Sequence, residues 1–222
     1  MVQKRKIVRK KIKQITISGN NDVYDLKTSK NHNFFANNIL IHNCGEIPLI
    51  PFGCCQLSAM NIWKFIKDGD FNWEKLYKTS KQIMVLMDNV IDKMDYPDER
   101  FKDVSIKYRQ VGIGMMGLSD TMFELDIKYD SLKGKEFAGK VMKTITMGCM
   151  DGSCELPGNF YNYDIFKDDM EEIASSLCDG DEILLTKIKN KGLRNSYFTT
   201  CAPTGTTAIS CDASYGIEPC FG

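Results

Sequence analysis

Charge divides this sequence into two unlike parts near residue 43. Residues 1–43 carry nine Lys and Arg against two Asp and Glu, a net charge of +7, whereas residues 44–222 carry 20 against 27, a net charge of −7. So sharp a change between segments indicates two functional parts. The whole chain, at 222 residues, is long enough for one or two domains with a sizeable core. We therefore expect a short basic piece at residues 1–43 and a larger folded domain at residues 44–222.

The basic piece has the pattern of β-structure. Seven Lys and Arg fall within its first 13 residues and alternate with β-branched side chains, which favours strands over a basic helix. Apolar runs at 34–35 and 39–41 flank Asn37-Asn38, a pair typical of turns. Residues 1–43 are thus expected to form a small all-β piece, too short to hold a core alone.

Helical spacing dominates the larger part. Apolar residues recur at helical positions over 72–94, and Pro97 follows the end of that pattern. A short apolar run at 111–116 predicts a strand, with a helix after it through residue 123. Further helices are expected at 135–150, 170–177 and 181–188, and a strand at 197–201. Strands that alternate with helices indicate an α/β arrangement after residue 44.

Cysteine usage and hydropathy indicate a cytoplasmic chain that does not enter a membrane. The nine cysteines are an odd number, and no signal-peptide pattern or 18-residue apolar window is present. We therefore expect reduced thiols and not a disulfide scaffold. A zinc site is disfavoured because the sequence has no Cys-x-x-Cys pair and no histidine beyond position 42.

The junction between the two parts carries reactive side chains in direct succession. Both histidines of the chain, His32 and His42, lie within residues 32–44, and His42 is followed by Asn43 and Cys44. A carboxamide that can attack its own backbone carbonyl, beside an imidazole and a thiol, can cut one peptide bond and help to form another. The alternative is a strand over residues 34–41 with two incidental histidines at its ends.

Sequence around this junction resembles the two C-terminal blocks of inteins. The matching segments are VYDL at 23–26, HNFFAN at 32–37 and HN at 42–43. The resemblance implies that residues 1–43 are a C-terminal split-intein fragment of the Hint-type β fold, which needs no cofactor for splicing. It also implies that Asp25 assists acyl transfer to Cys44, and that His32 and His42 promote cyclisation of Asn43.

A split intein needs an N-terminal partner chain, and the basic arm offers a way to capture it. None of the front-half intein blocks, such as a leading Cys or a Thr-x-x-His, is present, as in naturally split inteins; an artificial cut is the alternative. Complementary charge speeds the encounter of two halves. A nucleic-acid-binding arm is disfavoured, because the arm lacks aromatic residues for base stacking.

Three ordered blocks after residue 43 resemble the large chain of ribonucleotide reductases. They are CGEIPL at 44–49 with CQLSAMN at 55–61, RQVGIGMMGL at 109–118, and APTGT at 202–206 with GIEP at 216–219. The resemblance implies an α/β partial barrel of the reductase type in residues 44–222, and its motifs look most like the adenosylcobalamin-dependent branch. A radical-generating metallo-subunit is the alternative source of the radical, and the choice between diphosphate and triphosphate substrates stays open.

The same resemblance assigns roles to individual residues. Cys44 matches the cysteine that becomes a thiyl radical, Glu46 the carboxylate that takes a proton from the ribose, and Cys55 one cysteine of the reducing pair that an external dithiol regenerates. The other cysteine of the pair lies upstream in the family and is not part of this sequence, and Cys54 is an extra thiol. The substrate phosphate is assigned to Pro203, Thr204, Gly205, Thr206 and Thr207.

The phosphate assignment also makes physical sense, because a glycine-containing turn with hydroxyls that leads into a helix offers N–H groups to an anion. In contrast, we reject a dinucleotide fingerprint at Gly112, Gly114 and Gly117, since no acidic residue follows in a suitable strand. Close packing is the expected reason for these glycines.

The sequence as a whole therefore predicts a trans-splicing precursor whose C-terminal part is a catalytic segment of a ribonucleotide reductase. Its expected partners are an N-terminal chain, a ribonucleotide and a dithiol reductant, with no membrane. The alternatives are a non-catalytic interaction module with a basic β arm, and a reductase active as it stands. The second alternative is disfavoured by the length of the chain.

Overall fold

The computed structural model describes residues 33–36, 39–42, 46–47, 49–54, 56–178 and 180–220, the first two ranges by their backbone. The chain separates into two compact units, Met1–Gly45 and Glu46–Gly222. Within the first unit, β1 (Asn33–Ala36) and β2 (Ile39–His42) form an antiparallel hairpin in which Asn33 is opposite His42. Strands therefore lie on both sides of Asn37-Asn38, as expected. The remainder of the predicted all-β piece, including residues 1–32, lies outside the described residues.

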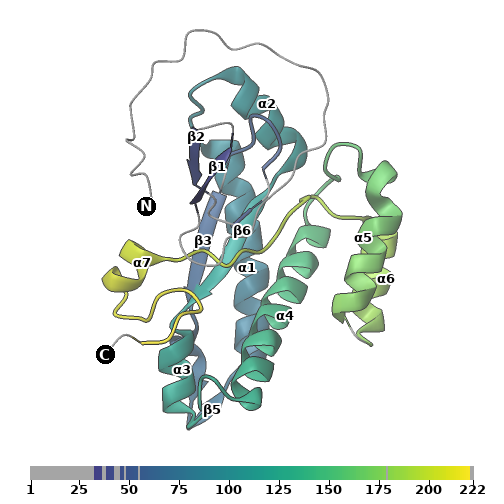
Figure 1. Cartoon of the computed structure of the whole chain (residues 1–222). Helices are drawn as coiled ribbons and strands as arrows, with labels where there is room; N and C mark the ends of the chain where they lie inside the picture. Colours follow the sequence, from purple (N-terminus) through teal and green to yellow (C-terminus); the bar gives the residue numbers. More distant parts are fainter. Residues whose placement is uncertain are drawn as a thin grey trace. The chain divides into compact units, whose positions relative to one another are not determined.

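The second unit is built on a short parallel sheet. β3 (Gln56–Asn61) pairs in parallel with β6 (Val111–Met116), with Gln56 opposite Val111. Residues 197–200 run along the other edge of β6, where the Ile113 N–H donates to the Phe198 carbonyl at 2.9 Å. β6 is thus the central strand, which explains why all six of its residues are buried. Figure 1 shows the segment before α7 crossing β6.

Two long helices pack together beside this sheet. α1 (Trp73–Lys93) and α4 (Leu132–Glu155) make the most extensive contact between any two elements of the described chain. Two glycines of α4 allow the close approach: a Cβ added at Gly148 would lie 2.6 Å from the Tyr77 carbonyl oxygen, and one at Gly152 would lie 2.7 Å from the Lys81 carbonyl oxygen. The small residues therefore set the distance between the two helices.

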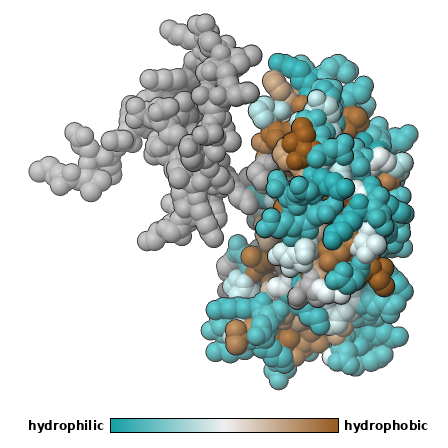
Figure 2. All heavy atoms as spheres, turned by 90° about the vertical axis from the view of Figure 1, so that its right-hand side faces the viewer, coloured by the Kyte–Doolittle hydropathy of each residue, from teal (hydrophilic) through white to brown (hydrophobic). Residues whose placement is uncertain are grey.

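The other elements are short or lie at the periphery. α5 (Tyr163–Cys178) and α6 (Glu182–Lys191) pack on each other and on α4. The side that carries them is largely polar with scattered apolar patches, as Figure 2 shows. The remaining elements are η1 (Ile62–Phe65), β4 (Ile66–Lys67), β5 (Asp70–Phe71), α2 (Glu99–Tyr108), α3 (Leu118–Glu124) and α7 (Gly205–Ser210). None of the described helices combines the length and the apolar character that crossing a membrane requires.

One apolar core joins the sheet to the helices. The largest fully buried side chains are Ile62, Leu76, Met84, Ile91, Val111, Ile113, Leu118, Met122, Ile145, Met150, Ile188 and Leu193. They come from β6, η1, the helices α1, α3, α4 and α6, and the segment after α6. A single core spanning these elements explains why residues 46–222 form one compact unit.

A charged cluster is buried beside this core. Asp88 of α1, which is 2 % exposed, accepts hydrogen bonds from Arg109 Nε at 2.6 Å, Arg194 Nε at 2.9 Å and Asn195 Nδ2 at 2.9 Å. Arg109 also holds Asp92 through two nitrogens, at 2.9 and 3.0 Å. The cluster ties α1 to the residues just before β6 and to those just before the 197–200 segment.

The architecture agrees with the α/β expectation only in its coarse outline. The described residues are mostly helical and contain few strands, and they do not close a barrel. The two parallel strands β3 and β6, with residues 197–200 along β6, are the part of a barrel-like sheet that they contain. The strand expected at 197–201 is not formed, since that segment makes only an isolated parallel bridge between Ile113 and Thr199. α2 and the short strands β4 and β5 were not anticipated, and α4 and α5 extend beyond their predicted ranges.

Candidate functional site

The structure describes about half of the residues singled out from the sequence. Asp25, His32, Asn43, Cys44 and Cys55 lie outside the described residues, and His42 ends β2 with its backbone alone described. Their assigned roles stay predictions. The described candidates are Glu46, Pro203, Thr204, Gly205, Thr206 and Thr207, all in the second unit.

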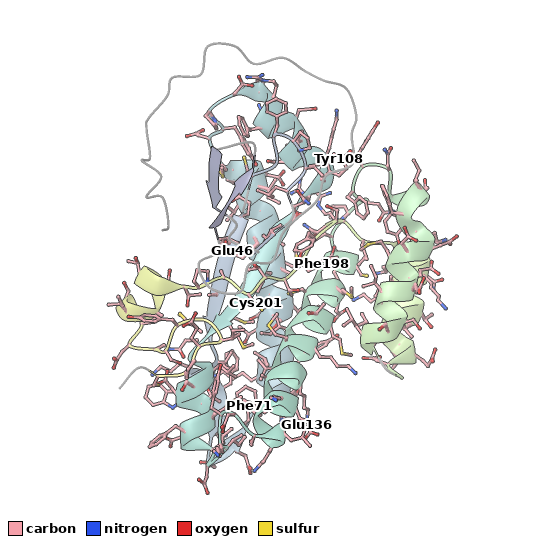
Figure 3. All side chains as sticks on the ribbon, viewed as in Figure 1. Glu46, Phe71, Tyr108, Glu136, Phe198 and Cys201 are labelled. Atoms are coloured by element: carbon pink, nitrogen blue, oxygen red, sulfur yellow. The ribbon has the colours of Figure 1, made fainter. Side chains whose placement is uncertain are left out.

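Glu46 is held against the segment that runs along β6. Its backbone carbonyl accepts a hydrogen bond from the Thr200 hydroxyl at 2.9 Å, although the two residues are 154 positions apart. Thr200 is itself buried and its N–H donates to the Ile113 carbonyl of β6 at 3.2 Å. In Figure 3 Glu46 lies beside the chain that carries Phe198 and Cys201.

A glycine of β6 makes room for the residue after Glu46. A Cβ added at Gly112 would overlap Ile47 Cδ1 and would lie 2.8 Å from Leu57 Cδ2. At Gly114 an added Cβ would lie 2.7 Å from the Thr200 carbonyl oxygen. Close packing therefore accounts for both glycines, as the sequence indicated, and the Glu46 segment sits on β6 because β6 lacks side chains there.

The predicted phosphate segment forms a tight turn into α7. Thr204 has left-handed backbone angles, with φ 50°, and its carbonyl accepts from the Ala208 N–H at 2.7 Å. Gly205, Thr206 and Thr207 are exposed, and the first N–H groups of a helix have no acceptor within that helix. The turn can therefore present backbone donors and hydroxyls to an anion.

The downstream block GIEP folds back onto this turn. The Gly216 N–H donates to Thr204 Oγ1 at 2.7 Å, and a Cβ added at Gly216 would lie 2.7 Å from the Ala202 carbonyl oxygen. Gly216 has φ 46°, so both its conformation and its surroundings require glycine. The APTGT and GIEP blocks, which are separated in sequence, thus form one local structure.

An open pocket of about 270 Å³ lies next to this structure, where the chain after α7 meets α3. Asp120 of α3 organises it, because its Oδ2 accepts from the Ser214 N–H at 2.6 Å. The neighbouring Ser119 hydroxyl accepts from the Cys220 N–H at 3.0 Å. The pocket is lined by Asp120, Asp212, Ala213, Ser214, Tyr215, Pro219 and Cys220.

Buried cysteines on the helices are unsuited to thiol chemistry. Burial raises the pKa of Cys154 to about 12 and the pKa of Cys178 to about 11, and it raises that of Cys149 as well. A thiolate is the reactive form of cysteine, so a raised pKa keeps these side chains inert at neutral pH. We regard them as small core residues.

Two residues of the site were missed by reasoning from the sequence. Thr200 lies three positions before Pro203, and Asp120 lies two positions after the block that ends at Leu118. A polar residue immediately beside a recognised block was the available signal for each. Neither residue could be paired with its partner, because Glu46 is 154 positions from Thr200 and Ser214 is 94 from Asp120.

The comparisons with known proteins agree on one family. The family model described as "Ribonucleotide reductase, barrel domain" matches residues 2–222. A vitamin B12-dependent ribonucleoside-diphosphate reductase of Mycobacterium tuberculosis is 28% identical over 179 residues, which are 80% of this chain and 23% of the relative. The enzyme of the same name from Thermoplasma acidophilum is 31% identical over 188 residues, 80% of this chain and 21% of the relative.

A relative with a different name also matches. The ribonucleoside-diphosphate reductase large subunit of Acanthamoeba polyphaga mimivirus is 30% identical over 185 residues, 76% of this chain and 21% of that protein. The chain thus spans between a fifth and a quarter of the length of these curated relatives.

Proposed function

Because this chain belongs to the ribonucleotide reductase barrel-domain family, we propose that residues 44–222 are a catalytic segment of a reductase that converts ribonucleotides to deoxyribonucleotides. The observation that carries this proposal is the contact between Glu46 and Thr200, at 2.9 Å. It fixes the backbone of Glu46, whose side chain is the predicted catalytic carboxylate, against the segment that leads into the predicted phosphate turn.

The chemistry assigned to the chain is radical-based. A thiyl radical on Cys44 takes the 3′-hydrogen of the ribose, and the Glu46 carboxylate accepts the proton of the 3′-hydroxyl. The 2′-hydroxyl leaves as water, and two electrons come from a dithiol pair that includes Cys55 and becomes a disulfide. Cys44 then returns a hydrogen atom to the 3′ carbon, and an external dithiol restores the pair.

The turn at Pro203–Thr207 would hold the substrate phosphate. Its exposed glycine, its two following hydroxyls and its free N–H groups suit an anion. Fixing the phosphate would place the ribose within reach of Cys44 and Glu46, which turns a loose encounter into an oriented one.

For the source of the radical we propose adenosylcobalamin, which forms a radical when its cobalt–carbon bond breaks; a radical-generating metallo-subunit is the alternative. Three open pockets among the described residues have volumes of about 270, 380 and 510 Å³, the range of sites for much smaller ligands, so none of the three would hold a cobalamin by itself. Residues outside the described part, or outside this chain, would have to hold the cofactor.

For residues 1–43 we propose a C-terminal split-intein fragment. The support is the ordered set of Asp25, His32, His42 and Asn43 ahead of Cys44. The match to the family model starts at residue 2 and so does not separate the two parts.

Splicing would proceed on the same cysteine that later carries the radical. Cys44 attacks the thioester at the junction of the N-terminal partner and accepts its acyl group, with Asp25 adjusting the protonation of the thiol. Asn43 then cyclises to a succinimide and the bond between Asn43 and Cys44 breaks, while His32 and His42 polarise the carbonyl and transfer the proton. A shift of the acyl group from sulfur to the Cys44 nitrogen leaves a normal peptide bond.

Intact mass spectrometry tests the splicing proposal. The chain mixed with its matching N-terminal partner under reducing conditions should yield a ligated product and a released fragment that ends at Asn43. The Asn43→Ala variant should accumulate the branched species on Cys44 without release. Unchanged masses with the matching partner would favour a non-catalytic interaction module, and normal splicing by Asn43→Ala would exclude cyclisation as the mechanism.

Deoxyribonucleotide formation by the ligated protein, supplied with the missing reductase segments, tests the reductase proposal. Cys44→Ser should abolish product, because an O–H bond is too strong to exchange hydrogen with the radical carrier. Cys55→Ser should stop multiple turnover, and Cys54→Ser serves as the matched control. Repeated turnover by Cys55→Ser with a dithiol would make Cys55 structural and Cys54 the candidate.

A further inference from the structure

We propose that Thr200 is a positioning residue that holds Glu46 in register with the phosphate turn. This inference rests on the proposed function of Glu46 and of residues 203–207, and it goes beyond that function by naming the group that links them. Thr200 does not touch the substrate in this proposal; it acts through the backbone of Glu46.

The first support is that the hydrogen bond between Thr200 and Glu46 comes from a buried side chain. The Thr200 hydroxyl donates to the Glu46 carbonyl at 2.9 Å from a side chain that is 4 % exposed. A hydrogen bond from a buried hydroxyl is costly to lose, since the acceptor is then left without a partner. Among the described residues, it is the polar contact that fastens the Glu46 backbone to the sheet.

The second support is that the backbone N–H, the methyl and the hydroxyl of Thr200 each contact a different neighbour. Its N–H donates to the Ile113 carbonyl at 3.2 Å, which fixes the backbone on β6. Its Cγ2 methyl lies 3.0 Å from where a Cβ of Gly112 would be, and 3.6 Å from that of Gly114. The methyl therefore packs over two glycines, while the hydroxyl makes the hydrogen bond to Glu46. Serine lacks the methyl and valine lacks the hydroxyl, so the two functions can be separated by substitution.

The third support is the short connection to the phosphate turn. Pro203 follows Thr200 by three residues, which span roughly 10 Å at most when extended. Thr204 is the N-cap of α7, and its Oγ1 accepts a hydrogen bond from the Gly216 N–H at 2.7 Å. A shift of Thr200 would therefore move Glu46 and the phosphate turn relative to each other, and small misplacements of reacting groups cost a great deal of rate.

Hydrogen–deuterium exchange on the chain as it exists tests the structural half of the proposal. In Thr200→Val, peptides that contain Glu46 and Ile47 should exchange about five-fold faster, the factor that corresponds to loss of about 1 kcal/mol. Thr200→Ser should exchange like the unaltered chain. Thr199→Val is the matched control, because the Thr199 hydroxyl makes no hydrogen bond to any described residue. Equal exchange in Thr200→Val and in the unaltered chain would overturn the proposal.

A double-mutant cycle in the assembled reductase tests the functional half. Thr200→Val should lower kcat by about 10- to 100-fold with little change in the KM for the ribonucleotide, and Thr200→Ser should restore most of it. In a Glu46→Gln background, adding Thr200→Val should lower kcat by less than a further two-fold. A full and independent loss in that background would overturn a role through Glu46. If the unaltered assembled reductase has no activity but Thr200→Val still exchanges hydrogen faster, then the proposed function has failed although the contact is real.

Discussion

Among the described residues, Asp88 is the buried carboxylate that two arginines share. Arg109 comes from a block recognised in the sequence, yet its side chain serves α1 by pairing with Asp88 and Asp92. Arg194 and Asn195 complete the cluster from a distant segment. Breaking a buried pair on one side leaves an uncompensated charge, which is far more costly than the pair is stabilising.

We predict that Asp88→Asn lowers the free energy of unfolding by about 3–5 kcal/mol, because it leaves Arg109 and Arg194 without their shared carboxylate. Urea denaturation followed by circular dichroism measures this loss. Asp98→Asn is the matched control: Asp98 pairs with Arg100 at the surface, and asparagine is an equally good helix cap, so that variant should lose no more than about 1 kcal/mol. Equal losses in the two variants would contradict the assigned role of the cluster.

The pH dependence of stability provides a second test of the role of Asp88. Burial by itself raises the pKa of Asp88, but hydrogen bonds from Arg109 and Arg194 outweigh burial, and its pKa is lowered. An unfolded aspartate titrates near about pH 3.9, so the contribution of Asp88 is fully present above that pH and is lost as the pH falls toward the lower folded value. The stability of the unaltered chain should therefore fall more steeply below about pH 4 than that of Asp88→Asn. Parallel curves of unfolding free energy against pH would refute this.

Individual residues also show how far sequence reasoning reaches. The close packing of Gly112 and Gly114 could be predicted, because a glycine inside an apolar strand commonly marks a place where another segment approaches the backbone. Thr200 and Asp88 could not be assigned, because each acquires its role from partners that the chain brings together over long separations, up to 154 and 107 positions. Periodicity carries no information about such pairs.

At the scale of elements, the α1–α4 contact depends on which glycine faces the partner helix. Gly148 and Gly139 are both on α4, but an added Cβ at Gly148 would meet the Tyr77 carbonyl at 2.6 Å and Ser80 Cβ at 2.7 Å, whereas Gly139 has nothing within 4 Å. The same substitution at the two positions therefore separates helix propensity from packing.

We predict opposite signs for the two variants. Gly139→Ala should stabilise the chain by up to about 1 kcal/mol, since alanine favours helix. Gly148→Ala should destabilise it by about 1–3 kcal/mol, because the α1 backbone must move away. The midpoint of urea unfolding measures both. If Gly148→Ala stabilises the chain as much as Gly139→Ala does, then α1 and α4 adjust to the added methyl group without cost.

Element prediction succeeded where periodicity was long and failed where contacts decide. The helix expected at 72–94 is α1, and the strand expected at 111–116 is β6. α2 has few apolar residues and is followed by the C-cap Arg109, whose left-handed conformation the buried charge cluster holds in place. The turn into α5 uses Asn162 with φ 61°, a conformation that no apolar pattern signals. A strand was expected at 197–201, but the structure has only an isolated bridge there, between Thr199 and Ile113, and the neighbour β6 could not be identified from sequence.

At the scale of the whole molecule, the charge difference between residues 1–43 and 44–222 bears on assembly. If the basic piece captures an N-terminal partner, as proposed, association should slow as salt rises, because its +7 charge attracts over long range. Raising ionic strength from about 0.05 to 1 M shortens the Debye length from above 10 Å to about 3 Å. Stopped-flow mixing of labelled halves measures the rate.

A variant with Lys4, Arg5 and Lys6 replaced by glutamine should bind more slowly at low salt and show a shallower salt dependence. Its rate at about 1 M salt should equal that of the unaltered chain. Association rates that do not respond to salt in either protein would assign capture to apolar contacts and not to the basic arm.

The central place of β6 also sets an order of events during synthesis. β6 pairs with β3, which precedes it, but its second neighbour at 197–200 emerges from the ribosome roughly 80 residues later, about 4–16 s at ordinary translation speeds. During that interval one edge of β6 has no strand beside it, and a strand edge in this condition pairs readily with other chains. The nascent chain is therefore exposed to aggregation until Thr200 has been translated, and slow codons between α4 and α6 would lengthen the exposure.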